Sequence, residues 1–112
     1  MMSTTQAFLS ITGGKCWDGG WLALVGKVHG VSQVYIPLAL NHGCSMIARQ
    51  WLGRHVEVVV NDMYTFVSTL RVKKKSALVV PLPWHLRGVV NGVVTLKIRP
   101  IEGDGYGNGA GS

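Results

Sequence analysis

The stretch "KVHGVSQVYIPL", residues 27–38, decides the fold, because two apolar strand patterns meet at a short turn and end on a proline. The stretch "RVKKKSALVVPL", residues 71–82, aligns with it without a gap at a shift of 44 residues. The identical pairs are Val28 with Val72, Ser32 with Ser76, Pro37 with Pro81 and Leu38 with Leu82. Such a repeat predicts two copies of one strand–turn–strand unit. The alternative is a pair of unrelated hairpins in an all-β chain.

The segments that follow the two prolines extend this match. "HVEVVV" at residues 55–60 aligns with "VVTLKI" at residues 93–98, at a shift of 38 residues. Other runs rich in Val, Ile, Leu, Thr and aromatic residues are bounded by Gly, Asn or Asp, as is typical of short strands. These runs lie at residues 8–12, 21–29 and 63–72. The sequence therefore predicts a mostly β chain.

One segment, residues 38–53, departs from the strand pattern. Leu40, Ile47 and Trp51 recur there at roughly helical spacing. In the second copy, Pro83 restricts any helix to about one turn. The predicted fold class is mostly β with one or two short helices.

The composition favours a small protein with a polyanionic partner. The chain has 112 residues, enough for one domain, and is 47% hydrophobic and 14% charged. So apolar a balance in so small a chain predicts a surface that meets another subunit. The formal net charge of +6 favours nucleic acid over an acidic protein or a membrane. No signal peptide or membrane span is expected, since the apolar window at residues 21–40 is interrupted by polar side chains.

Cys16 and Cys44 are the only cysteines, and they form no CxxC motif. Neither a zinc module nor a disulfide framework is predicted, and a reducing cytoplasm fits best. We expect Cys44 to be a buried, inert thiol. Its neighbour His42 offers no catalytic pair, because no acidic side chain lies close in sequence to orient it. We predict no catalytic site, metal, cofactor or small-molecule substrate.

Both repeated stretches resemble the first hairpin of AbrB-type swapped-hairpin DNA-binding domains. The matching residues are Val28, Ser32, Val34, Ile36, Pro37 and Leu40, and then Val72, Ser76, Leu78, Val80, Pro81 and Trp84. The resemblance covers roughly residues 24–98. Two copies in one chain are similar to the arrangement of the MraZ family, in which tandem units pack within one polypeptide.

The resemblance implies tandem swapped-hairpin units that interlock into a pseudo-twofold, β-barrel-like core. The expected units are residues 21–62 and 63–102, preceded by an extension with a possible extra strand at 1–20 and followed by a flexible Gly-rich tail at 103–112. The implied partner is double-stranded DNA, bound by a homodimer or higher homo-oligomer. The implied role is transcription regulation or DNA organisation, with a cytoplasmic, nucleoid-associated location.

The basic cluster in the second copy is the principal candidate site. Alternation along a strand predicts that Leu70 and Val72 face a core while Arg71 and Lys73 face water. Lys74 and Lys75 would form the turn and complete a cationic rim suited to a phosphate backbone. The guanidinium of Arg71 could pair with a guanine edge, whereas the lysines position the protein. The further predicted DNA contacts are Lys27, His29, Arg49, Arg54 and Arg87.

Several alternatives stay open at this point. The lysines could be a solvated turn that protects a sheet edge from aggregation. The tryptophans are expected to pack mostly in the core or a subunit interface, and stacking on single-stranded bases is the less favoured alternative. A structural or assembly protein that forms a β oligomer, such as a viral or particle component, is the second functional hypothesis.

Overall fold

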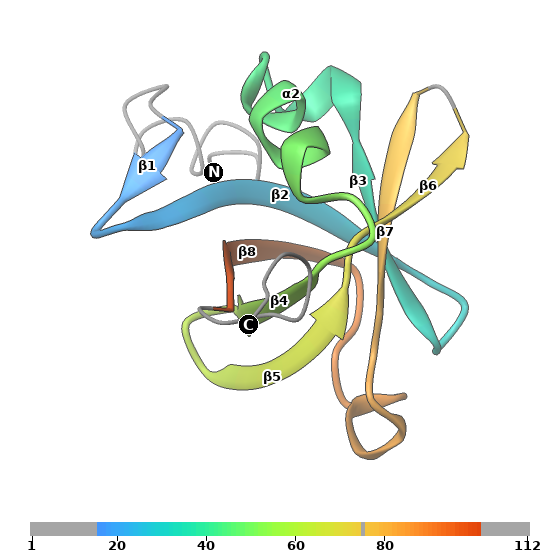
Figure 1. Cartoon of the computed structure of the whole chain (residues 1–112). Helices are drawn as coiled ribbons and strands as arrows, with labels where there is room; N and C mark the ends of the chain where they lie inside the picture. The colour runs from blue at the N-terminus through green and yellow to red at the C-terminus, as the bar shows by residue number, and fades with distance from the viewer. Residues whose placement is uncertain (1–15, 75, 102–112) are drawn as a thin grey trace, which may run out of the picture.

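The computed structural model describes residues 16–74 and 76–101, which form one antiparallel sheet with short helices at its edge (Figure 1). The order of pairing is β5-β4-β8-β2-β3-β7-β6, and β1 pairs separately with β2. The prediction of a mostly β chain is confirmed. The strands are β1 (Trp17–Asp18), β2 (Trp21–His29), β3 (Gln33–Pro37), β4 (His55–Val60), β5 (Tyr64–Thr69), β6 (Arg71–Lys74), β7 (Ala77–Pro81) and β8 (Val93–Pro100).

The sheet curls into a barrel-like form. Strands β5 and β6 stand at opposite ends of the pairing order, yet Leu70 alone separates them in the chain. The Ser68 hydroxyl donates a hydrogen bond to the Pro81 carbonyl at 2.7 Å, which joins β5 to the end of β7. One face of the curled sheet encloses the core, as alternation along half-buried strands requires. Its fully buried members include Leu22, Leu24, Val34, Ile36, Val56, Val58, Val60, Leu70, Leu78, Val80, Leu96 and Ile98.

The pairing register relates the two repeated stretches by a local twofold. In the β3–β7 ladder Tyr35 pairs with Val79, the residue 44 positions later. In the β4–β8 ladder Val59 pairs with Lys97, the residue 38 positions later. The hydrogen bonds that flank the first ladder are also equivalent: Leu38 N to Ser76 O and Leu82 N to Ser32 O, both 2.9 Å.

The two copies differ at one pair of equivalent positions, Gly26 in β2 and Leu70 between β5 and β6. β2 continues through Gly26, where a Cβ would contact the Val34 side chain and lie 2.9 Å from Leu96 Cδ1. The counterpart of Gly26 is Leu70, which is fully buried and lies between β5 and β6. The single strand predicted over residues 63–72 is therefore two strands.

Short helices replace the longer predicted one. The segment at 38–53 contains η1 (Leu38–Leu40), α2 (Cys44–Ala48) and η2 (Arg49–Trp51). Gly43, with φ of 88°, interrupts the helical path before α2. The second copy has only η3 (Trp84–Leu86), in agreement with the limit set by Pro83. Within the described part of the chain, no helix reaches the length and hydrophobicity that a membrane crossing requires.

Candidate nucleic-acid interface

The β6–β7 hairpin carries the predicted basic cluster on an edge strand. All four residues of β6 are exposed, whereas Ala77 to Val80 of β7 are buried. Arg71, Lys73 and Lys74 are thus open to solvent, while Lys75 lies outside the described residues. We call these three described cations and their strand the basic hairpin. The prediction that Val72 faces the core is wrong, since 51% of it is exposed.

Val72 is exposed although it pairs with the fully buried Leu78, because β6 is the last strand of the pairing order; β6 also contains a bulge, which comes after Val72. Val72 pairs with Leu78 and Lys74 pairs with Ala77, so Lys73 is an extra residue without a partner in β7. A bulge bends the strand and changes the direction of its side chains. Before the bulge, the Arg71 Nε donates to the Thr69 hydroxyl at 3.1 Å, which holds the guanidinium beside its own strand.

The acidic side chains that the structure describes lie elsewhere and are paired. Lys97 on β8 contacts Asp62 at 2.9 Å and Asp18 at 3.3 Å. The hydrogen bond that Lys97 donates to Asp62 raises the pKa of Lys97; burial opposes this shift, and Asp18 adds to it.

The third described acid is also held at β8. Glu57 accepts two 3.0 Å contacts from Arg99, whose guanidinium lies 3.9 Å from the ring centroid of Trp21. Across residues 16–74 and 76–101, no ion pair joins Arg71, Lys73 or Lys74 to an acid. The positive charge of the basic hairpin is therefore not neutralised by these carboxylates.

The structure does not gather the other predicted contacts around this cluster. Because β3 and β7 are antiparallel, the turn of the β2–β3 hairpin lies at the opposite end of the ladder from the turn of the β6–β7 hairpin (Figure 1). Lys27, His29 and Arg87 belong to the β2–β3 end and are exposed. Arg49 and Arg54 are partly buried in the segment between α2 and β4, and both make other contacts. The predicted site is thus divided between two ends.

The β2–β3 end carries a shallow groove of about 330 Å³. The His29 and Tyr35 rings stack there, with centroids 4.5 Å apart and an interplanar angle of 20°. The groove is lined by Lys27, Val28, His29, Tyr35, Gly92 and Val93. The nearby Arg87 Nε donates to the Leu82 carbonyl at 3.4 Å. Aromatic rings therefore lie beside a cation at this end. The positions of the basic residues in the sequence do not indicate this pairing of rings with positive charge.

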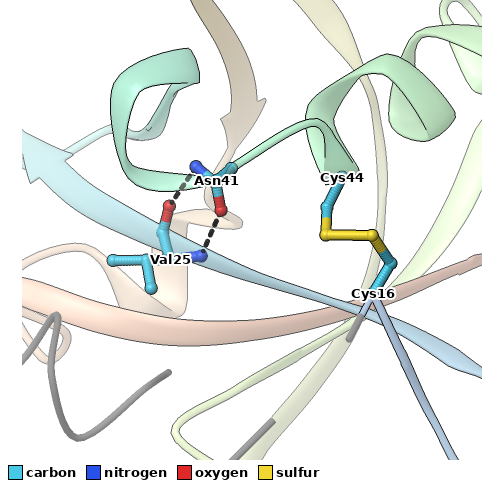
Figure 2. The surroundings of a disulfide bond; sticks show 4 residues. All are labelled: Cys16, Val25, Asn41 and Cys44. Carbon is cyan, nitrogen blue, oxygen red and sulfur yellow. Dashed lines mark hydrogen bonds between the residues drawn. A yellow bond between two sulfur atoms is a disulfide. The ribbon is translucent and has the colours of Figure 1, made fainter. Parts of the chain in front are cut away.

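A disulfide joins Cys16 and Cys44, contrary to the expectation of reduced thiols (Figure 2). It fastens the residue before β1 to the first residue of α2. No spacing motif predicts this bond, because the two cysteines are 28 residues apart; their even number is the only indication. Bonds of this kind persist in oxidising surroundings and are rare in a reducing cytosol.

Asn41 anchors the same segment to the sheet (Figure 2). β3 pairs with β2 only from Lys27 to His29, so the backbone of Val25 extends beyond that ladder. The buried Asn41 amide accepts from Val25 N at 2.8 Å and donates to Val25 O at 3.2 Å. A single side chain thus satisfies two backbone groups that would otherwise be buried without partners.

Within the described ranges, no three His, Cys, Asp or Glu side chains are placed to hold a metal ion. Comparisons with protein-family models, curated proteins and solved structures found no match. The geometry and charge of the two ends are therefore the basis on which a function can be proposed.

Proposed function

We propose that the chain is a non-enzymatic protein that binds double-stranded DNA through the basic hairpin. The observation that carries the proposal is an edge hairpin on which Arg71, Lys73 and Lys74 are exposed and, among the described residues, unpaired with acids. Each phosphate neutralised by such a cation releases condensed counterions, which makes the binding favourable and dependent on salt.

A two-stranded ribbon is a suitable element for this task. The major groove of B-form DNA admits a two-stranded β-ribbon, and the β6–β7 hairpin would meet the groove through β6 and its turn, since β7 also pairs with β3 along its whole length. Arg71 would read a guanine edge with its planar fork, while Lys73 and Lys74 would hold the backbone. All three cations are exposed to solvent, with Arg71 before the bulge and Lys73 and Lys74 at it.

The proposal includes the AbrB-like arrangement of tandem swapped-hairpin units. It is supported by the twofold register of the β3–β7 and β4–β8 ladders. A homodimer would bring a second basic hairpin to the same duplex. A nucleoid-associated role in transcription regulation or DNA organisation would then require surroundings in which the Cys16–Cys44 disulfide stays oxidised.

The double variant Lys73→Ala/Lys74→Ala tests the site. We expect duplex affinity at moderate salt to fall at least about tenfold, and the slope of log affinity against log salt to lose about two units. Thermal stability should change little, because both side chains are exposed. Fluorescence anisotropy of a labelled duplex over a salt series measures both quantities.

Lys97→Ala/Arg99→Ala is the matched control. It removes the same charge from side chains that already pair with acids. If the control loses as much duplex affinity as the hairpin variant, binding follows net charge and the site assignment is wrong. Unchanged binding by the hairpin variant would have the same consequence.

A second candidate, an assembly protein that forms a β oligomer, is favoured by one observation. Val67 of β5 is 57% exposed, and Met63 in the turn before β5 is 70% exposed; β5 stands at one end of the pairing order. An apolar edge of this kind can pair with another chain. A solution mass well above that of a dimer, together with no duplex binding at low salt, would favour this candidate over DNA binding.

A further inference from the structure

The loop between β7 and β8 is hydrogen-bonded to the β2–β3 hairpin at both of its ends. It leaves the sheet where Leu82 N donates to Ser32 O, and it rejoins where Val28 N donates to Gly92 O, both at 2.9 Å. In Figure 1 this orange loop projects at the bottom, the hairpin turn lies to its right, and both face away from the β6–β7 turn at the top. We call residues 27–35 and 82–93 together the aromatic end.

The side chain of Trp84, on this loop, is exposed to solvent. It is 81% exposed, the highest value among the exposed large hydrophobic side chains that the structure describes. It is therefore no part of this chain's core, unlike the packing expected for most tryptophans. The turn that carries it is closed by Leu86 N to Pro83 O at 3.0 Å and Arg87 N to Trp84 O at 3.1 Å. A tryptophan ring on an exposed turn offers a large apolar face and a polar N–H to a binding partner.

A second aromatic surface and two cations lie at the same end. The stacked His29 and Tyr35 rings line the groove, with Lys27 at its side. Arg87 follows Trp84 by three residues and is exposed. The three acids that the structure describes are instead paired with Lys97 and Arg99 on β8. The aromatic end thus combines ring faces with positive charge.

We infer that the aromatic end binds unpaired bases of single-stranded nucleic acid. Trp84 and the His29–Tyr35 pair supply faces on which bases stack, and Lys27 and Arg87 contact the backbone phosphates. Stacking platforms beside cations are the usual means of binding single strands without sequence preference. The cations favour this ligand over an apolar protein surface, and the ring faces favour it over a duplex, whose bases are already stacked. The inference shares the ligand class of the proposed function but uses a different surface.

The test compares a labelled oligothymidine of about 12 nucleotides with a blunt duplex, by anisotropy at low salt. We expect Trp84→Ala to weaken oligothymidine binding about tenfold, since one lost stacking contact has an effect of this order. Trp84→Phe should retain most of the affinity, because it keeps a ring face. Trp17→Phe is the control, since Trp17 is half-exposed and lies on β1, which pairs only with the far end of β2.

The two proposals fail separately. Lys73→Ala/Lys74→Ala should weaken duplex binding and spare the stacking contribution of Trp84, so that Trp84→Ala in this background still costs about tenfold for oligothymidine. Unchanged affinity of Trp84→Ala for oligothymidine would overturn the inference, and so would a wild-type protein that binds no oligothymidine. A loss of dimer mass in Trp84→Ala without a loss of oligothymidine affinity would also overturn it, and would assign the ring to self-association.

Discussion

The two ends of the β3–β7 ladder share a backbone plan but present different chemistry. At one end the turn of the β6–β7 hairpin follows Lys73 and Lys74, and at the other the turn of the β2–β3 hairpin follows His29. Equivalent backbone hydrogen bonds flank the ladder at both ends. The repeated backbone therefore determines where each surface lies, and the residues near each turn determine what that surface can bind.

The reason lies in which positions the ladder constrains. Val34 and Ile36 of β3 pair with Val80 and Leu78 of β7, and all four are fully buried. A change of register by one residue would turn these side chains to the outside, so they must stay apolar. The turn residues carry no such constraint and are free to differ between the copies.

The largest expected effect is on stability, at the equivalent positions Leu70 and Gly26. Leu70→Ala should lower the free energy of unfolding by about 2 to 5 kcal/mol, because Leu70 is fully buried and its loss leaves a cavity. At the equivalent position, Gly26→Ala should cost about 1 to 3 kcal/mol for the opposite reason, which is overpacking against Val34 and Leu96. Denaturant unfolding measures both. A stable Gly26→Ala protein would contradict the close packing at that crossing.

The disulfide is a second difference between the two copies, because it holds the segment after β3 and has no counterpart in the segment after β7. Reduction, or Cys16→Ala/Cys44→Ala, should lower the free energy of unfolding by about 3 kcal/mol, since it frees a loop with a sequence separation of 28 residues in the unfolded chain.

Hydrogen exchange locates the effect of reduction. The amide of Met46, bonded to Gly43 O, should lose more protection than the amide of Val28, bonded to Gly92 O. Equal losses at the two amides would mean that the bond acts on the whole fold rather than on one end.

The smallest expected effect concerns the ion pairs of Lys97 on β8 with Asp18 and Asp62. The folded-state pKa of Lys97 is raised, so its ion pairs stabilise the fold below the ordinary lysine pKa of about 10.4 and lose that contribution as the pH rises through the raised value. The contribution is below about 1 kcal/mol, because the pairs are exposed to solvent. The stability difference between wild type and Lys97→Met should therefore shrink at high pH. A constant difference would assign the effect to packing.

Much of the local structure could be predicted from residue patterns. Alternating apolar residues, the two matched prolines and the glycines predicted the strands of both hairpins, and Pro83 correctly limited the second helix. The pattern failed at Val72, which is exposed on the last strand of the pairing order, and at Leu70, where one predicted strand becomes two. Both failures arise from pairing with distant strands, to which a local pattern is blind.

The candidate site divides in the same way. The sequence alone determined that Arg71, Lys73 and Lys74 belong to a cationic hairpin, because their charge and their position beside a strand are local properties. Only the tertiary structure decided that Lys27, His29 and Arg87 lie at the other end, that the described acids are paired at β8, and that Cys16 meets Cys44. Antiparallel pairing of β3 with β7 places the turns of the two repeated hairpins at opposite ends of the ladder. Such long-range pairing depends on the whole chain and cannot be read from either repeat alone.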